Sequence, residues 1–152
     1  MSNILNELKA QELLKGLDDS EIAKIVPVVS NIKVAKDDDL FRQGEPCKGI
    51  YMIKSGKVEI SKTTPDGWRQ PFVILTPGHF IGEIALLEKT EHASDARALE
   101  PSELFLIQRN LFEEMELKEP LIMLKIIKNI ALIAGLNVRR MNDKFIKALI
   151  NY

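Results

Sequence analysis

The residues best suited to chemistry lie in one short segment near the middle of the chain. Gly82 and Glu83 precede a short apolar run, Ile84 to Leu87, and His92 follows after a polar loop. Glycine tolerates the tight backbone turn that a closely bound ligand requires. The first turn of a helix offers free N–H groups to an anion. The spacing therefore favours binding of a small anion, and the alternative is an ordinary turn with a surface carboxylate.

The other reactive side chains form no comparable group. Cys47 is the single cysteine, so no internal disulfide and no metal site of several cysteines is expected. His79 lies beside a turn and has few companions that could share a metal ion. The sequence contains no Gly-x-Ser-x-Gly, His-Glu-x-x-His or Walker-type motif. We therefore expect no enzyme, no metal and no cofactor.

Short strands are expected around the Gly82 segment, between residues 31 and 107. Apolar and polar side chains alternate there, and turn signals such as Pro65-Asp66-Gly67 separate the runs. Closely spaced short strands are typical of a small roll or barrel, whose closure hides strand edges. We predict an α+β, mainly β protein with an antiparallel β-roll of the jelly-roll, cupin-like type. Helices in residues 1–30 and 108–152 complete one domain.

The composition is that of an ordinary globular protein of 152 residues, with 45% hydrophobic and 28% charged residues. Lys+Arg 21 against Asp+Glu 22 lacks the positive excess that binds nucleic acids or anionic membranes. No signal segment opens the chain, and the apolar stretch from Leu121 to Leu136 is interrupted by Lys125 and Lys128. We expect a cytoplasmic protein with no membrane contact and no DNA-binding domain in this chain.

A long final helix is expected from Pro120, and it carries two apolar stripes. Ile122, Ile126, Ile130 and Ile133 form one stripe in its first half. The other stripe has the spacing of three and four residues that is typical of a coiled coil. We expect one stripe to pack on the roll and the other on the same helix of a second copy; burial of both within one monomer is the alternative. The dimer stripe consists of Leu124, Ile127, Ala131, Ala134, Val138, Met141, Phe145 and Leu149.

The segment from Phe80 to Leu87 resembles the phosphate-binding cassette of the cyclic-nucleotide-binding domain family. That family includes catabolite-activator-type regulators and the regulatory subunits of cyclic-AMP-dependent kinase. Leu40 to Glu45 and Gly49 to Ile60 resemble its early strands and turns, and Leu75 to Gly78 matches the lead into the cassette. The resemblance covers roughly residues 15–145. It implies a sensor fold with a cassette-like segment at residues 80–98.

The resemblance also implies a ligand and its contacts. The ligand would be cyclic AMP, with cyclic GMP less favoured because Ala93 replaces a hydroxyl residue. The backbone at Gly82 and the helical turn after it would contact the phosphate, and Glu83 would accept a hydrogen bond from the ribose 2'-hydroxyl. The implied binding residues are Gly82, Glu83, Ile84, Ala85, Leu86, His92, Ala93 and Ser94.

His92 departs from the family, because the resemblance implies an arginine there that pairs with the phosphate. Arginine supplies a permanent charge and a two-pronged donor, whereas histidine, with a reference pKa of about 6.5, is only partly charged at neutral pH. Losing one partner of a buried charge pair costs about 2–5 kcal/mol, so we expect binding weakened tens- to thousands-fold. A nearby phosphate would raise the pKa of His92. Strand alternation makes Arg97 a poor substitute, since it would pair with Asp95 on the outer face.

Two functions remain open. The first is a stand-alone sensor, in which a cyclic nucleotide or another small anion shifts the final helix through different affinities for two helix arrangements. An effector protein, not identified by the sequence, would receive the signal. The second is a degenerate domain that binds no nucleotide and serves as a homodimerising or docking module. Gly82-Glu83 with Ala93-Ser94 favours the first function, and His92 favours the second.

Overall fold

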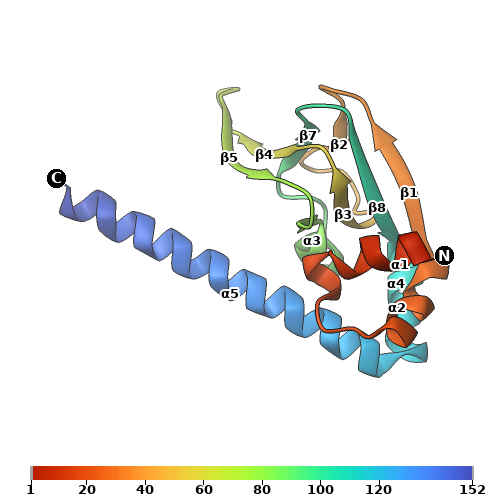
Figure 1. Ribbon diagram of the computed structural model, residues 1–152. Coiled ribbons are helices and arrows are strands. Elements are labelled where there is room, and N and C mark those ends of the chain that lie inside the picture. Colours follow the sequence, from red (N-terminus) through yellow and green to blue (C-terminus); the bar gives the residue numbers. More distant parts are fainter. Residues whose placement is uncertain (1, 152) are drawn as a thin grey trace.

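Eight short strands form within residues 2–151, which the computed structural model describes, where apolar and polar side chains alternate along the sequence. They pair into two antiparallel sheets with the strand orders β1-β8-β3-β6 and β2-β7-β4-β5 (Figure 1). The predicted antiparallel β-roll is confirmed. The strands are β1 (Val29–Val34), β2 (Asp39–Phe41), β3 (Gly49–Ser55), β4 (Val58–Thr63), β5 (Arg69–Leu75), β6 (Phe80–Ile81), β7 (Asp95–Ala98) and β8 (Ser102–Gln108).

Helices lie before, within and after the strands. Helix α2 begins with a capping box: the Glu21 N–H donates to the Asp18 carboxylate at 2.9 Å, and the Asp18 N–H donates to the Glu21 carboxylate at 3.1 Å. Proline cannot continue a helix, and α2 ends two residues before Pro27. The helical elements are α1 (Ser2–Lys9), η1 (Glu12–Leu14), α2 (Asp19–Ile25), η2 (Val26–Val28), α3 (Glu83–Glu88), α4 (Arg109–Lys118) and α5 (Pro120–Ile150).

Strand β3 separates two apolar cores, because successive side chains of a strand point to opposite faces. Tyr51 and Ile53 belong to the core inside the roll, while Ile50 and Met52 belong to a core shared with the helices. Strand β8 divides its side chains in the same way. The roll core consists of Phe41, Tyr51, Ile53, Val58, Ile60, Ile81, Ala96, Leu104 and Leu106.

The N-terminal helices are attached to strand β3 and to the turn that leads into β6. The Gln11 side chain donates from Nε2 to the Ile53 carbonyl at 3.1 Å. The Glu12 N–H donates to the Gly78 carbonyl at 2.9 Å. Both contacts join the helical layer to strand β3 and the turn before β6. The position of α3 therefore depends on the helices as well as on the sheets.

Helix α5 consists of a docked half and a free half. In the docked half, Ile122, Ile126 and Ile130 are buried in the core shared with the helices, and Asn129 donates from Nδ2 to the Leu13 and Lys15 carbonyls at 2.8 and 2.9 Å. The first stripe thus packs mainly on the N-terminal helices, whereas we expected it to pack on the roll itself. The free half extends away from the rest of the molecule (Figure 1).

The second stripe of α5 is mostly exposed in the monomer, although Ile127 is half-buried against the core shared with the helices. Leu124 is 49% exposed near its start, Val138 is 55% exposed and Phe145 is 65% exposed in the free half. The alternative that one monomer buries both stripes is therefore wrong. A helix with an uncovered apolar stripe of this length has a face available for a partner.

Helix α5 also differs from the expectation about membranes. By length and composition alone it is long and apolar enough to cross a bilayer, with an 18-residue stretch of mean hydropathy 1.8, although we expected Lys125 and Lys128 to exclude this. The docked half has protein contacts instead, since Lys125 binds the Glu21 carboxylate at 2.7 Å. The same face cannot contact the N-terminal helices and lipid at once.

Candidate functional site

Gly82 makes the tight turn that the sequence predicts. Its φ is +96°, in the left-handed region, and it forms the N-cap of α3. A Cβ at this position would lie 2.8 Å from the Gly49 carbonyl oxygen, with ring carbons of His92 and Tyr51 each 3.7 Å away. Glycine satisfies both the backbone conformation and the close approach. The turn is therefore held directly against the start of β3.

Helix α3 offers its first N–H groups at this turn. The first intrahelical bond joins the Leu86 N–H to the Gly82 carbonyl at 3.1 Å, so the N–H groups of residues 83–85 have no partner inside the helix. The side chains of Ala85 and Leu86 are buried in the core shared with the helices. Among the predicted binding residues these two can therefore face a ligand only through their backbone. Ile84 is 50% exposed and can offer its side chain.

Glu83 is a half-buried carboxylate without an opposite charge. Burial raises its pKa above the ordinary value, and a hydrogen bond from its own backbone N–H opposes that shift. Across residues 2–151, no lysine, arginine or histidine forms an ion pair with it. Its oxygens therefore retain the capacity to accept hydrogen bonds from a hydroxyl group.

His92 is buried, with 4% of its surface exposed. Its ring stacks on the ring of Phe41, with centroids 3.5 Å apart and planes inclined by 6°. Backbone bonds hold it on both sides: the His92 N–H donates to the Glu45 carbonyl at 3.0 Å, and the Gly44 N–H donates to the His92 carbonyl at 2.8 Å. Its Nε2 has no hydrogen-bond partner in the part of the chain that the structure describes. Burial lowers the pKa of His92, and the Glu45 carboxylate partly opposes this.

The residues after His92 have separate environments. Ala93 is exposed and Ser94 is half-buried. Arg97 lies on the outer face of β7, since its neighbours Ala96 and Ala98 are buried, and its Nε lies 3.2 Å from an oxygen of Asp39. It does not approach the Gly82 turn. The expected pair of Arg97 with Asp95 is wrong, because the Asp95 carboxylate instead accepts the Gln43 N–H at 2.7 Å.

Cys47 lies behind the Gly82 turn. Its Sγ is 3.5 Å from the Gly49 carbonyl oxygen and 3.7 Å from that of Gly82. Burial raises the pKa of its thiol, so the reactive thiolate is disfavoured. Cys47 therefore packs against the turn as an unreactive thiol.

Sequence reasoning missed Phe41 and Tyr51 as parts of this site. Phe41 stacks on His92, and Tyr51 lies beside both Phe41 and the Gly82 turn. Period-two alternation places both side chains inside the roll. Neither the alternation nor the motif indicates which interior side chain meets His92, because the pairing joins distant strands.

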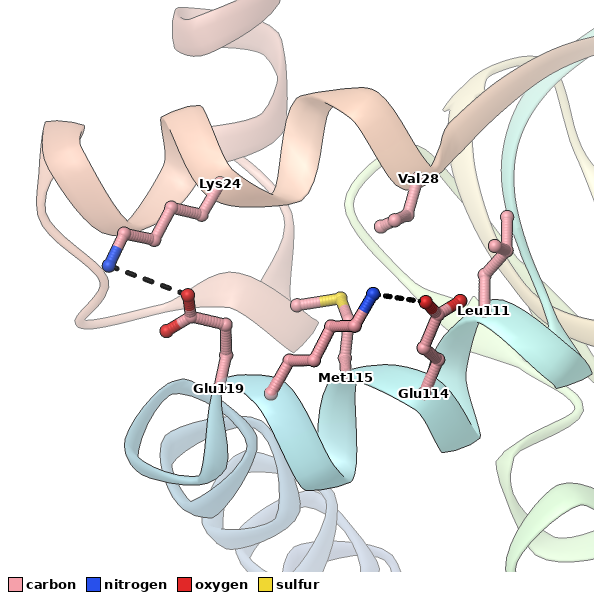
Figure 2. A pocket seen from close by; sticks show the side chains of 7 residues that line it. Lys24, Val28, Leu111, Glu114, Met115 and Glu119 are labelled. Carbon is pink, nitrogen blue, oxygen red and sulfur yellow. Dashed lines mark hydrogen bonds and ion pairs between the residues drawn. The ribbon is translucent and has the colours of Figure 1, made fainter.

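Two surface depressions lie elsewhere. Figure 2 shows the first, a groove of about 260 Å³ between α2 and α4, where Lys24 faces Glu119 across an ion pair of 3.5 Å. Its other charged residues, Lys118 and Glu114, also pair with each other. A second depression of about 550 Å³ lies around Lys48 and Arg109. Neither is lined by Gly82, Glu83 or His92.

Comparison with known proteins matches residues 31–118 to the family described as "Cyclic nucleotide-binding domain". A putative potassium channel protein of Rhodopseudomonas palustris is 31% identical over 114 residues, which is 75% of this chain and 27% of that protein. The cyclic AMP receptor protein of Thermus thermophilus is 27% identical over 115 residues, 76% of this chain and 53% of that protein. This chain thus spans about half or less of these two relatives.

A solved structure supports the same fold. A cyclic nucleotide-binding domain from Methylobacillus flagellatus superposes with a TM-score of 0.82 at 17% identity, over 94% of this chain and 80% of that one. At this identity the likeness concerns the path of the backbone. The two four-stranded sheets, the short helix after Gly82 and the long final helix belong to a known architecture.

Proposed function

Because this chain belongs to the cyclic nucleotide-binding domain family, we propose that it is a regulatory sensor that binds a cyclic nucleotide at the Gly82 turn. The family is a regulatory, ligand-binding one, and we propose no catalytic activity for this chain. One observation supports the proposal above the others. At this turn the Nε2 of the buried His92 ring has no hydrogen-bond partner within the described residues, and an unpartnered buried polar group is costly unless something else satisfies it.

The ligand contacts follow from the chemistry of these groups. The free N–H groups of residues 84 and 85 would bind the phosphate oxygens, which the N-terminus of α3 favours electrostatically. Glu83 would accept a hydrogen bond from the ribose 2'-hydroxyl. His92 would contact the phosphate, and the exposed side chains of Ile84 and Ala93 would contact sugar and base. Ala93 favours cyclic AMP over cyclic GMP.

The free half of α5 would carry the signal. A ligand changes the position of a helix only if it binds two helix arrangements with different affinity. The dimer stripe of α5 would pack on the same stripe of a second copy, and an effector protein in the cytoplasm would respond to the change. Met141→Glu is expected to yield a monomer in sedimentation experiments, whereas Asn137→Glu, on the helix face beside the stripe, leaves the dimer intact. A monomeric parent protein would contradict this part of the proposal.

A second candidate function has an observation in its favour. The stack of His92 on Phe41 places two rings inside the roll beside the Gly82 turn, where the family's arginine would extend toward a phosphate. A domain with this interior could bind no nucleotide and serve as a docking module. The two candidates differ in whether a nucleotide binds at all.

Calorimetric titration with cyclic AMP and cyclic GMP separates them. The sensor predicts weak binding by the parent protein and tighter binding by His92→Arg, by tens- to thousands-fold. His79→Arg adds the same charge outside the site and is expected to leave the affinity unchanged. Binding by His92→Arg alone would establish the docking module, and absence of binding in both proteins would overturn the sensor.

A further inference from the structure

The unpartnered Nε2 of His92 has a consequence for how an anion binds. The ring is enclosed by Phe41 on one face and lies next to the Gly82 turn, with Cε1 3.7 Å from the position of a Cβ at Gly82. Backbone bonds to Gly44 and Glu45 hold the main chain of His92 in place. A buried ring nitrogen of this kind gains a partner only when something enters beside it.

We propose that His92 takes up a proton together with the anionic ligand, and that Phe41 is the positioning residue that holds the imidazole ring for this role. The inference rests on the proposed function, because it concerns the regulation of the same site. The only transfer is one proton from solvent to a ring nitrogen of His92, which then donates a hydrogen bond to the ligand's phosphate. Ligand affinity therefore depends on pH.

The ionisable groups around the ring belong to several elements. Glu45 and Cys47 lie in the segment between β2 and β3, Tyr51 lies in β3, and Glu83 begins α3. Glu45 favours the protonated ring, and burial disfavours it more strongly. Burial also raises the pKa values of Cys47, Tyr51 and Glu83, so burial opposes a negative charge on each of them. Without an anion, His92 is accordingly neutral at neutral pH.

A bound phosphate reverses this balance. Its negative charge beside the ring favours the imidazolium form, and the face of Phe41 favours a cation as well. The basic side chains nearest in sequence do not compensate: Arg42 and Arg97 both bind Asp39 on the outer face. Linkage then requires the ligand affinity to rise by up to tenfold for each unit by which the pH falls. This holds between the pKa of His92 in the bound state and its lower pKa in the free state.

The stack on Phe41 explains how the imidazole ring can bind a phosphate although it lacks the two-pronged donor of arginine. A parallel stack at 3.5 Å fixes the plane of the ring, so the direction of its N–H bonds is set before a ligand arrives. Leucine at position 41 would keep the site apolar and remove the aromatic face. The pH dependence would then weaken although the proton-binding residue is still present.

The test is calorimetry with cyclic AMP between pH 5.5 and 8, in buffers of different ionisation enthalpy, which counts the protons taken up on binding. The parent protein is expected to bind more tightly at acid pH with proton uptake. His92→Gln and His92→Arg are both expected to show a flat profile, with weak and tight binding respectively. Phe41→Leu is expected to show a reduced slope. His79→Gln and Phe72→Leu are the matched controls, since both residues lie outside the site.

The outcomes separate this inference from the proposed function. Binding by the parent protein with a flat pH profile, or proton uptake that persists in His92→Gln, would overturn the inference while leaving the sensor intact. Binding by His92→Arg with none by the parent protein even at pH 5.5 would overturn it in favour of the docking module. No binding by any variant would remove the proposed function as well. Circular dichroism on each variant shows whether it is folded.

Discussion

Two regions of the molecule differ in how fully their polar groups are hydrogen-bonded. One is the junction of α5 with the N-terminal helices, and the other is the turn at Gly82. At the junction, Asn129 spans two carbonyl groups and Lys125 binds Glu21. At the Gly82 turn, the Nε2 of His92 has no hydrogen-bond partner in the described chain, and burial disfavours the charge of Glu83. Satisfied polar groups hold a fold together, whereas unsatisfied ones leave free energy for a ligand to recover. Gln11 at the start of η1 also has an unpartnered buried oxygen, so the contrast is clearest between Asn129 and His92.

Gly82→Ala is expected to have the largest effect on stability, because the added methyl group would clash at the Gly82 turn. The added Cβ would lie 2.8 Å from the Gly49 carbonyl in a backbone at φ +96°, so we expect a loss of about 2–4 kcal/mol of unfolding free energy, measured by urea denaturation. Gly44→Ala is the control, with φ +90° and no atom within 4 Å; it isolates the backbone strain. Equal losses at both positions would contradict the close contact.

Asn129→Ala tests the supporting region. It removes two hydrogen bonds and leaves the carbonyls of Leu13 and Lys15 without this donor, which is expected to cost about 1–2 kcal/mol. Asn137→Ala, on the exposed part of the same helix, is expected to change the free energy of unfolding only slightly. If both variants melt at the same temperature, the docked half of α5 does not depend on these bonds.

The acid sensitivity of the fold tests His92 in the absence of ligand. Its folded-state pKa lies below 6.5, so the unfolded chain binds the proton first and unfolding free energy is lost as pH falls below 6.5 toward the folded-state pKa. His92→Gln removes this loss, so its stability relative to the parent protein should rise by up to about 1 kcal/mol between pH 7 and pH 5.5. Parallel stability curves would show that His92 is accessible to protons in the folded state.

Glu83→Gln is expected to have the smallest effect on stability. Its pH dependence is opposite to that of His92, because Glu83 carries its disfavoured charge at high pH and not at low pH. Because burial raises the pKa of Glu83, folding disfavours its charge, and stability is lost as pH rises from 4.5 through the folded-state pKa. At pH 7 the amide should melt roughly 1–3 °C higher and bind cyclic AMP more weakly. Glu88→Gln, at the exposed end of α3, is the control. A lower melting temperature for Glu83→Gln would mean that the carboxylate supports the fold.

The sequence predicts the parts of this molecule that depend on local patterns. Period-two alternation predicts the antiparallel roll, the Asp18 and Glu21 spacing predicts the cap of α2, and Gly82 predicts a tight turn. Contacts between distant segments are not predictable in this way. The stack of His92 on Phe41 requires knowing which strands face each other, and the docking of α5 on the N-terminal helices requires knowing where the chain returns. A repeating pattern specifies a face and not its partner.

The short η1 segment has a mechanical consequence. Its Glu12 is bonded to the turn that precedes β6 and its Leu13 to Asn129 of α5, so one short helical turn contacts both. Helix α5 has 31 residues and is about 46 Å long at 1.5 Å per residue, with its unsupported arm making up roughly 25 Å of that length. A rotation of about 10° at η1 would swing the tip of that arm through roughly 4 Å. A small rotation at η1 thereby becomes a shift of the helix tip comparable to most of a helical turn.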